Sequence, residues 1–359
     1  MLYYNHDMKT IPQISKDILW KRYHFTPEGS ERYMANSTMA DVAREAGVAL
    51  TTVGRVLNGG YVSEEKREKV NAAIRKLGYV PNKMARSLKA SESKLIGVFL
   101  RFNPNQLYAH IANGLTRAIE AAGYNSYIIT SYDRRYENQI DEFISRKVDG
   151  LMIVSMADVG EKVVEKVQNA GIPVVMIERC LDMPKVDRVV INDFDGAKEA
   201  VNSLIDYGCR DIAYVGMKPN HSVEQERYDG YVKALLESGF EQKPGLVKMT
   251  ESYTMEAGFE AAKQLVESGT KVDAAFCTAD TLAAGFMQYL YTKNIRVPDE
   301  IRLTGYDDVI AKLLSPQISS VSLNYDLIGE KAMKLMLYRI KNPQLEAREI
   351  RTDTKFNKR

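Results

Sequence analysis

Residues 38–60 read TMADVAREAGVALTTVGRVLNGG, and this stretch decides the fold of the first part of the chain. A first helix is predicted over residues 39–46, and Gly47 then provides a turn. A second helix is predicted over residues 50–57, because its apolar side chains recur at the spacing of one helix face. Two short helices joined at a glycine turn are typical of a helix-turn-helix.

The ends of these two helices differ in quality. Thr38 and Asp41 have the spacing of a capping box, which predicts a well-defined start for the first helix. Ala49 precedes the second helix at the position where a capping hydroxyl is expected, and Gly54 lies inside that helix. A missing cap and a mid-helix glycine each cost roughly 1 kcal/mol of helix stability.

A third helix is predicted from Glu64 to Leu77, with Ser63 as its cap and Gly78 as its end. Three helices around a shared apolar cluster are enough for a small all-α domain over residues 38–80. The polar and basic residues 81–93 form a linker, either a flexible tether or a helical turn that orders when something holds it. Residues 1–37 show no sustained pattern, and we expect either a disordered N-terminal extension or, preferably, a mis-called start with Met34 as the true one.

The charge is unevenly distributed along the chain. Residues 38–90 carry ten lysines and arginines against five acidic residues, whereas residues 91–359 have a net charge of −4. A small basic module joined to a larger acidic body is the balance expected when only the module meets phosphate groups. We therefore expect the first domain to bind a partner rich in phosphate groups, as double-stranded DNA is.

Short apolar strands alternate with amphipathic helices from Leu95 onward. This alternation predicts parallel sheets covered by helices on both faces, and the region is long enough for two doubly wound lobes with a ligand cleft at the strand ends. The chain is predicted to cross between the lobes near residues 191 and 323 of a domain spanning 94–359. The predicted strands are 95–100, 124–130, 150–154, 172–177, 211–216, 274–278 and 301–306, and the predicted helices include 107–122, 195–207 and 281–293.

Several classes of protein are disfavoured by the sequence. No apolar run is long enough to cross a membrane and no secretory signal begins the chain, so we expect a cytoplasmic protein that associates with the nucleoid when bound. The three cysteines are scattered, which favours reduced thiols over disulfides or a zinc site. Hydrolase, metalloprotease and phosphate-loop motifs are absent, so neither an enzyme, a metal site nor a cofactor is expected.

The stretch from Asp41 to Val98 resembles the DNA-binding and hinge pattern of the lactose repressor family of bacterial transcription regulators. The motifs ERYDGY (226–231), TADTLAAG (278–285) and VPDEIRLTGYDD (297–308) are similar to motifs of that family's core, which resembles periplasmic binding proteins. The resemblance covers roughly residues 38–350. It implies a homodimer that binds an operator and responds allosterically to a small carbohydrate effector.

The resemblance implies that the second helix is a recognition helix in the major groove. Leu50 and Thr51 would then face bases and Arg55 would reach a guanine edge or a phosphate, while a hinge helix enters the minor groove with Leu88 wedged between base pairs. Leu50 could instead be a core leucine, and Tyr61 could only shield the motif. The full predicted DNA-binding set is Thr38, Leu50, Thr51, Thr52, Arg55, Asn58, Tyr61, Ser63, Asn82, Ala85, Arg86 and Leu88.

The resemblance also implies which residues bind the effector. Arg227 and Asp307 would hold effector hydroxyls, because carboxylates and a guanidinium are what polyol recognition needs. Asp307 and Asp195 could instead cap turns or helices, and Tyr325 could simply pack where the lobes meet. The full predicted set is Arg101, Phe102, Asp195, Arg227, Tyr253, Asp280, Asp307 and Tyr325.

Two departures from the family pattern concern the effector. Ala279 stands where an asparagine is usual, and the first strand runs into Arg101 and Phe102 in place of a Pro-Asp pair. An arginine at the carboxyl end of a strand favours an anion, so a sugar phosphate or sugar acid is an alternative to a neutral sugar. Two other functions stay open, namely a global carbon-control regulator with a protein or purine co-repressor and, less favoured, a sugar-binding transport protein.

Overall fold

The computed structural model describes residues 37–80, 92–101, 106–131, 136–154, 160–178, 186–219 and 222–359. These residues belong to two compact units, an N-terminal domain within residues 1–86 and a core within residues 87–359. The predictions for the N-terminal extension and for the hinge fall on residues outside this description.

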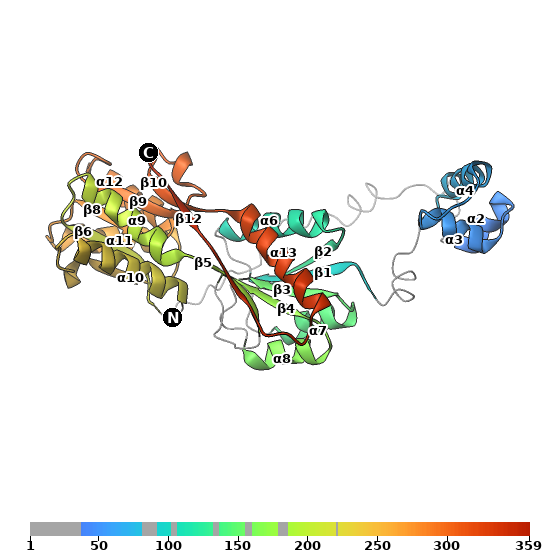
Figure 1. Cartoon of the computed structure of the whole chain (residues 1–359). Coiled ribbons are helices and arrows are strands. Elements are labelled where there is room, and N and C mark those ends of the chain that lie inside the picture. Colours follow the sequence, from blue (N-terminus) through green and yellow to red (C-terminus); the bar gives the residue numbers. More distant parts are fainter. Residues whose placement is uncertain are drawn as a thin grey trace, which may run out of the picture. The chain divides into compact units, whose positions relative to one another are not determined.

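The N-terminal domain is a three-helix unit (Figure 1). Its helices are α2 (Met39–Ala46), α3 (Leu50–Leu57) and α4 (Glu64–Leu77), with the bounds predicted from the sequence. One side chain from each helix is fully buried at the centre, namely Val42, Val53 and Val70. The apolar periodicity therefore locates both the helices and their shared core.

The helix ends partly follow the predicted caps. The Asp41 carboxylate accepts hydrogen bonds from the Thr38 backbone N–H at 2.9 Å and from its hydroxyl at 2.6 Å, and these bonds lower the pKa of Asp41. Gly47 adopts a left-handed conformation that closes the turn. Ser63 occupies the N-cap position of α4 as predicted, but its side chain makes no capping hydrogen bond.

The first lobe of the core is built on a six-stranded parallel sheet with the order β11-β5-β4-β3-β1-β2. Alternate residues face opposite layers: Val98 packs with the residues of α6 and α13, whereas Phe99 packs with those of α7 and α8. The strands are β1 (Leu95–Arg101), β2 (Asn125–Ser131), β3 (Gly150–Val154), β4 (Val174–Ile177), β5 (Asp187–Ile191) and β11 (Glu349–Thr352). The helices are α6 (Leu107–Ala121), α7 (Glu137–Ser145), α8 (Glu161–Asn169) and α13 (Tyr325–Lys341).

The second lobe repeats this plan with the strand order β12-β10-β9-β8-β6-β7, in which only β12 runs antiparallel to its neighbour. Helices α9 (Asp193–Asp206) and α10 (Ser222–Glu237) pack on one face, and α11 (Met255–Glu267) and α12 (Asp280–Thr292) on the other. The strands are β6 (Ile212–Met217), β7 (Val247–Thr250), β8 (Ala274–Cys277), β9 (Arg302–Asp307), β10 (Ser319–Leu323) and β12 (Thr354–Asn357). The predicted fold class is therefore confirmed: two doubly wound lobes follow an all-α domain.

The chain passes between the two lobes at three places (Figure 1). It crosses at Asn192 after β5, at Asn324 after β10 and at Asp353 between β11 and β12. The sequence predicts crossings near 191 and 323, but not the third, because β11 and β12 are short and polar. In the described part of the chain, no helix is both long and apolar enough to span a membrane.

Candidate functional site

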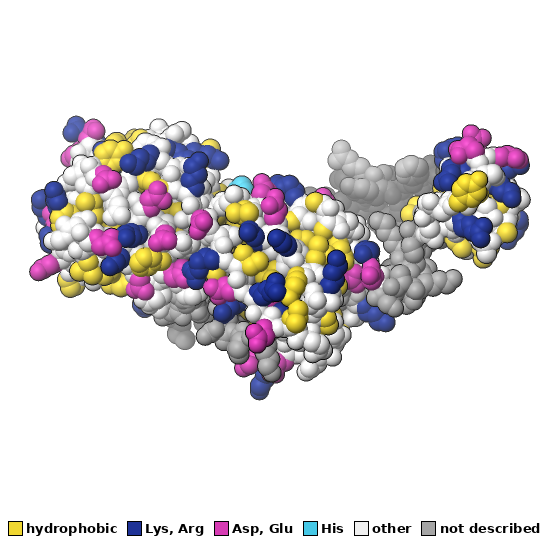
Figure 2. Space-filling view, viewed as in Figure 1, with side chains coloured by type: hydrophobic (Ala, Val, Ile, Leu, Met, Phe, Trp, Pro, Cys, Tyr) yellow, Lys and Arg dark blue, Asp and Glu magenta, His cyan; other side chains and the backbone are white. Residues whose placement is uncertain are grey.

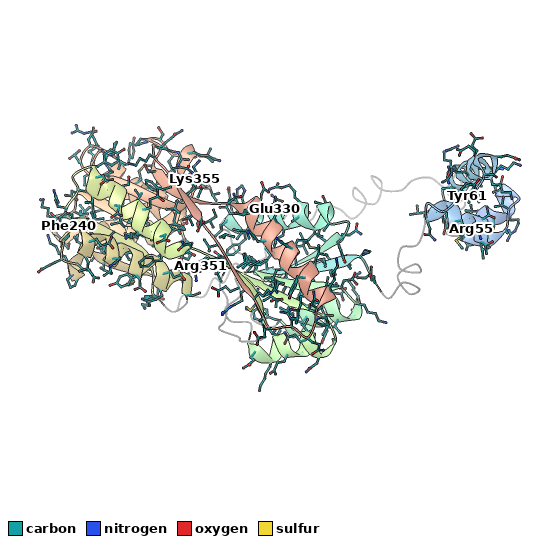
Figure 3. The ribbon with its side chains drawn as sticks, in the orientation of Figure 1. Arg55, Tyr61, Phe240, Glu330, Arg351 and Lys355 are labelled. Atoms are coloured by element: carbon teal, nitrogen blue, oxygen red, sulfur yellow. The ribbon has the colours of Figure 1, made fainter. Side chains whose placement is uncertain are left out.

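The exposed surface of α3 carries the side chains that the sequence assigns to base contacts. Leu50 is 47% exposed, so it is not a core leucine, and Thr51 and Arg55 on the same helix are exposed as well. Figure 3 labels Arg55 on this domain, and the space-filling view shows lysine and arginine side chains on the domain's surface (Figure 2). The helix therefore presents polar and basic groups outward while Val53 anchors it.

The flanking residues predicted to contact DNA are also available on the surface. Thr38, Asn58 and Ser63 are exposed, Thr52 is partly buried, and Tyr61 is 94% exposed in the loop after α3. At that exposure the Tyr61 ring covers no part of the domain's apolar cluster, which argues against a shielding role. The hinge residues Asn82, Ala85, Arg86 and Leu88 lie outside the described residues.

The α3 start lacks a capping side chain, as the sequence predicts. Ala49 has extended backbone dihedrals and makes no side-chain cap bond. A Cβ atom added at Gly54 would meet nothing within 4 Å. Both positions therefore have room for a serine hydroxyl.

The second lobe buries Arg227 of α10 at the carboxyl edge of its sheet. The side chain is 3% exposed, Nε donates to Asp193 Oδ1 at 2.7 Å, and Nη1 donates to the Thr278 carbonyl oxygen at 2.7 Å. The guanidinium also stacks 3.8 Å from the centroid of the Tyr306 ring. Burial is the largest single influence and alone would lower the pKa of Arg227, but the attractions to Asp193, Tyr306, Tyr253 and Asp307 together outweigh it, and the pKa is raised well above its ordinary value.

The second terminal nitrogen of Arg227 is not held in the same way. Nη2 makes no hydrogen bond to any described residue and lies 3.9 Å from Asp307 Oδ1. Asp307 ends β9 with a left-handed φ of 92° and is 2% exposed. The structure thus brings together Arg227 and Asp307, which the sequence assigns to one site.

Asp193, which sequence reasoning missed, is the principal partner of Arg227. The sequence points to Asp195, but Asp195 is exposed, and its backbone N–H and carboxylate both bond the side chain of Asn192. Asp195 therefore belongs to the cap of α9, one of the alternatives that the sequence leaves open. The asparagine three residues ahead of Asp195 is the signal that could have shown this.

Two predicted aromatic residues border the same region. The Tyr325 hydroxyl donates to the Asp307 carbonyl oxygen at 2.9 Å, and its ring stacks on His110 with centroids 5.2 Å apart. The Tyr253 hydroxyl donates to Glu224 Oε1 at 3.2 Å. Glu224 is 1% exposed and lies one helical turn before Arg227, and it too was missed from the sequence.

Asp280 does not have the geometry of an effector ligand. Its Oδ1 accepts a hydrogen bond from the Ser320 hydroxyl at 2.6 Å, and its Oδ2 accepts the backbone N–H groups of Ile310 and Ala311, both at 3.0 Å. Burial raises the pKa of this carboxyl group. Asp280 therefore joins α12 to the segments after β9 and before β10, and its assignment to the effector stays a prediction that this geometry does not favour.

The remaining predicted residues are Arg101 and Phe102, at the end of the first strand of the core. Only the backbone of Arg101, the last residue of β1, is described, and Phe102 lies outside the description. Ala279 is 1% exposed at the start of α12 and makes no side-chain cap. An anion at the end of β1 stays a prediction.

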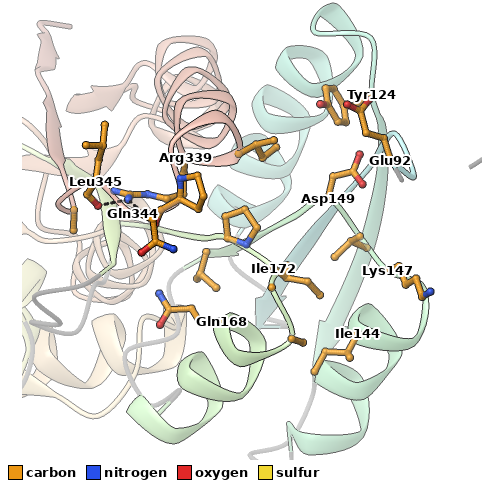
Figure 4. A pocket seen from close by; sticks show the side chains of 18 of the residues that line it. Glu92, Tyr124, Ile144, Lys147, Asp149, Gln168, Ile172, Arg339, Gln344 and Leu345 are labelled. Carbon is orange, nitrogen blue, oxygen red and sulfur yellow. Dashed lines mark hydrogen bonds between the residues drawn. The ribbon is translucent and has the colours of Figure 1, made fainter. Parts of the chain in front are cut away.

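A large cavity lies elsewhere, at the amino ends of the first lobe's strands (Figure 4). It has a volume of about 1290 Å³ and is bordered by α8, the end of α13 and residues 343–347. Its Arg339 is already engaged, with Asp187 at 2.7 Å and 2.9 Å and with backbone carbonyls. Because ligands in doubly wound folds bind at the carboxyl ends of strands, the cluster around Arg227 is the better candidate.

Both the N-terminal domain and the core of the chain match models of known protein families. Residues 38–82 match the family described as bacterial regulatory proteins, lacI family, and residues 93–359 match periplasmic binding proteins and sugar binding domain of LacI family. The ribose operon repressor of Haemophilus influenzae is 30% identical over 318 residues, which cover 88% of this chain and 95% of that protein.

Two solved structures extend the comparison. The complex of the transcriptional regulator CelR with cellobiose is 29% identical with a TM-score of 0.68, covering 89% of this chain and 98% of that one. A lac repressor dimer bound to operator and the anti-inducer ONPF has a TM-score of 0.79, covering 90% of this chain and 98% of that one. At 22% identity, this second likeness shows the fold alone.

The resemblance inferred from the sequence is thereby confirmed over nearly all of residues 38–359. The three-helix domain and the two-lobed core each fall within one of these two matches. The protein belongs to the LacI family of bacterial regulatory proteins and is a DNA-binding transcriptional regulator, not an enzyme.

Proposed function

We propose that the protein is a homodimeric repressor of carbohydrate-utilisation genes, which acts in the cytoplasm and whose operator binding is controlled by a small sugar or sugar phosphate. The observation that carries the effector part is the geometry of Arg227. Two of its nitrogens are held by the protein, and Nη2 lies beside the Asp307 carboxylate.

This arrangement suits a ligand that carries hydroxyl groups. A guanidinium N–H donates a hydrogen bond to a hydroxyl oxygen, and a neighbouring carboxylate accepts a hydrogen bond from a hydroxyl group. Because Asp193 and Thr278 hold the guanidinium, it needs no reorganisation when the ligand arrives. The CelR structure is a complex with cellobiose, which supports a sugar as the ligand class.

The charge of the effector is tested by calorimetric titration. A neutral hexose and its 6-phosphate are each titrated into the full chain, and into a variant with Arg101→Gln. Tight binding of the phosphate alone, lost in the variant, supports an anion held by Arg101. Tight binding of the neutral form alone removes the anion from the proposal and keeps the sugar.

The operator part rests on α3 and on the hinge. Leu50, Thr51 and Arg55 are exposed on one helix, which suits entry into the major groove. Leu88 of each protomer is proposed to wedge between base pairs at the operator centre. The lac repressor structure is a dimer bound to operator, which supports two copies of the chain on the DNA.

The variant Leu88→Ala tests the hinge by fluorescence anisotropy on operator DNA. Loss of an apolar wedge should weaken operator binding by tenfold or more, because the cost of bending the DNA is no longer offset. Effector affinity should stay unchanged in the same preparation. Unaltered operator affinity would remove Leu88 from the interface.

A further inference from the structure

An ion pair joins the two lobes on the strand that makes the third crossing. Arg351 belongs to β11 of the first lobe, and Glu226 belongs to α10 of the second. Arg351 Nη1 lies 3.0 Å from Glu226 Oε1 and 3.2 Å from Oε2, so one nitrogen contacts both carboxylate oxygens. Figure 3 labels Arg351 on this strand, two residues before the chain enters the second lobe.

The pair continues into a row of charges within the first lobe. Arg351 Nη2 lies 3.5 Å from Glu349 Oε1, and Glu349 Oε2 lies 3.1 Å from Arg188 Nη2 of β5. The hydrogen bond to Glu226 is the largest cause of the raised pKa of Arg351. Glu226 is therefore the second lobe's contribution to a row that is otherwise built on two strands of the first lobe.

This row borders a cavity that both lobes enclose. The cavity has a volume of about 220 Å³ and is lined by Arg188, Glu349 and Arg351 from the first lobe and by Val223 and Glu226 from the second. Asp193, the partner of Arg227, lines it as well. A change in the angle between the lobes would therefore alter both the geometry of the ion pair and the wall of the proposed effector site.

We propose that Arg351 and Glu226 form an ionic clasp that holds the two lobes in the arrangement seen in this structure. The side chains are 44% and 29% exposed, so salt screens their attraction and the pair contributes modestly, which corresponds to a two- to five-fold change in an equilibrium. That is enough to shift a balance between lobe arrangements that differ by little in free energy. The bond from Tyr325 to the Asp307 carbonyl also joins the lobes, but it is uncharged and insensitive to screening.

The clasp is tested without DNA and without an effector, so the result does not depend on the proposed function. Spin labels carried by p-acetylphenylalanine replace two exposed residues, Lys162 of α8 in the first lobe and Asp206 of α9 in the second. Pulsed dipolar spectroscopy on the full chain, diluted with unlabelled protein, gives the distribution of distances between the lobes. Glu226→Gln, Arg351→Gln and the double variant are compared with the parent.

The matched control is Lys198→Gln. Lys198 of α9 pairs at 2.6 Å with Glu237, which lies on α10 as Glu226 does, but this pair stays within the second lobe. Each clasp variant should lower the ratio between the population at the parent distance and the populations at other distances two- to five-fold, and the double variant should add nothing further. Raising the salt from about 0.05 M to about 0.5 M should shift the parent in the same direction and leave the clasp variants unmoved. Distributions that match the parent and the control at both salt concentrations, or changes that add in the double variant, would overturn the clasp.

Discussion

Arg227 is a charged side chain that the fold removes almost completely from solvent. Such burial is tolerated only where the charge is paired and its donors are satisfied. Asp193 and the Thr278 carbonyl oxygen meet that demand for two of its nitrogens. The third nitrogen remains beside Asp307, which makes this single residue the strongest link between the fold and a ligand.

The sequence could predict Arg227 and Asp307 because each belongs to a recurrent motif. It could not predict Asp193, because only the tertiary fold shows which of the two acidic residues near the start of α9 turns toward the arginine. It assigned Asp280 to the effector because a carboxylate at a helix start suits either role. The three hydrogen bonds that occupy Asp280 come from residues 30 to 40 positions away, which no local pattern contains.

The pairing of Asp193 predicts a difference between two neighbouring aspartates. Asp193→Asn should destabilise the core by about 3 kcal/mol, because it leaves the buried guanidinium without its counter-charge. Asp195→Asn should change stability by less than about 0.5 kcal/mol, because Asp195 is exposed. Urea unfolding of the full chain measures both, and equal effects would contradict the assignment of Asp193.

Two substitutions on the recognition helix should strengthen operator binding. Ala49→Ser restores a capping hydroxyl to α3, and Gly54→Ser removes a flexible residue at a position with open space around it. Each change should raise operator affinity about two- to five-fold, in line with roughly 1 kcal/mol or less per substitution. Fluorescence anisotropy provides the measurement, with Ala72→Ser on the exposed face of α4 as the control. If neither affinity rises, Thr51 and Thr52 already fill this role.

At the scale of elements, hydrophobic periodicity was sufficient for most of the fold. The three N-terminal helices and the seven strands named from the sequence all occur within a few residues of their predicted bounds. The strands without a sequence signal were β5, β7, β10, β11 and β12. All are short, and three of them lie at a sheet edge, where one side needs no apolar residues.

The close packing of α6 against α13 depends on small residues at the contact. A Cβ atom added at Gly114 of α6 would lie 2.2 Å from the Tyr325 carbonyl oxygen at the start of α13. Gly114→Ala should therefore destabilise the core by roughly 1 to 3 kcal/mol and displace Tyr325 from Asp307. Calorimetry measures the loss, with Gly245→Ala as the control because its added Cβ would meet nothing closer than 3.7 Å. An unchanged unfolding temperature in Gly114→Ala would show that the two helices separate without cost.

In the whole molecule, one chain carries the DNA-binding domain and both lobes, and it passes between the two lobes repeatedly. Three crossings connect the lobes, and the third carries Arg351 toward Glu226. A sequence alone cannot place a crossing between two four-residue strands, since their pairing is decided by distant partners. Ligand-dependent control then requires that the effector favour one lobe arrangement over another.

The central claim is that a small carbohydrate controls binding of this chain to its operator. The most direct measurement is a gel-shift of the full chain on the DNA upstream of its own gene, with a panel of neutral sugars, sugar acids and sugar phosphates. We expect one specific complex that resists competitor DNA and whose amount changes with one member of the panel. In Arg227→Gln, this response should be lost while DNA binding is retained. A specific complex that no member of the panel alters, or that responds equally in Arg227→Gln, would contradict control of operator binding by a carbohydrate bound at Arg227.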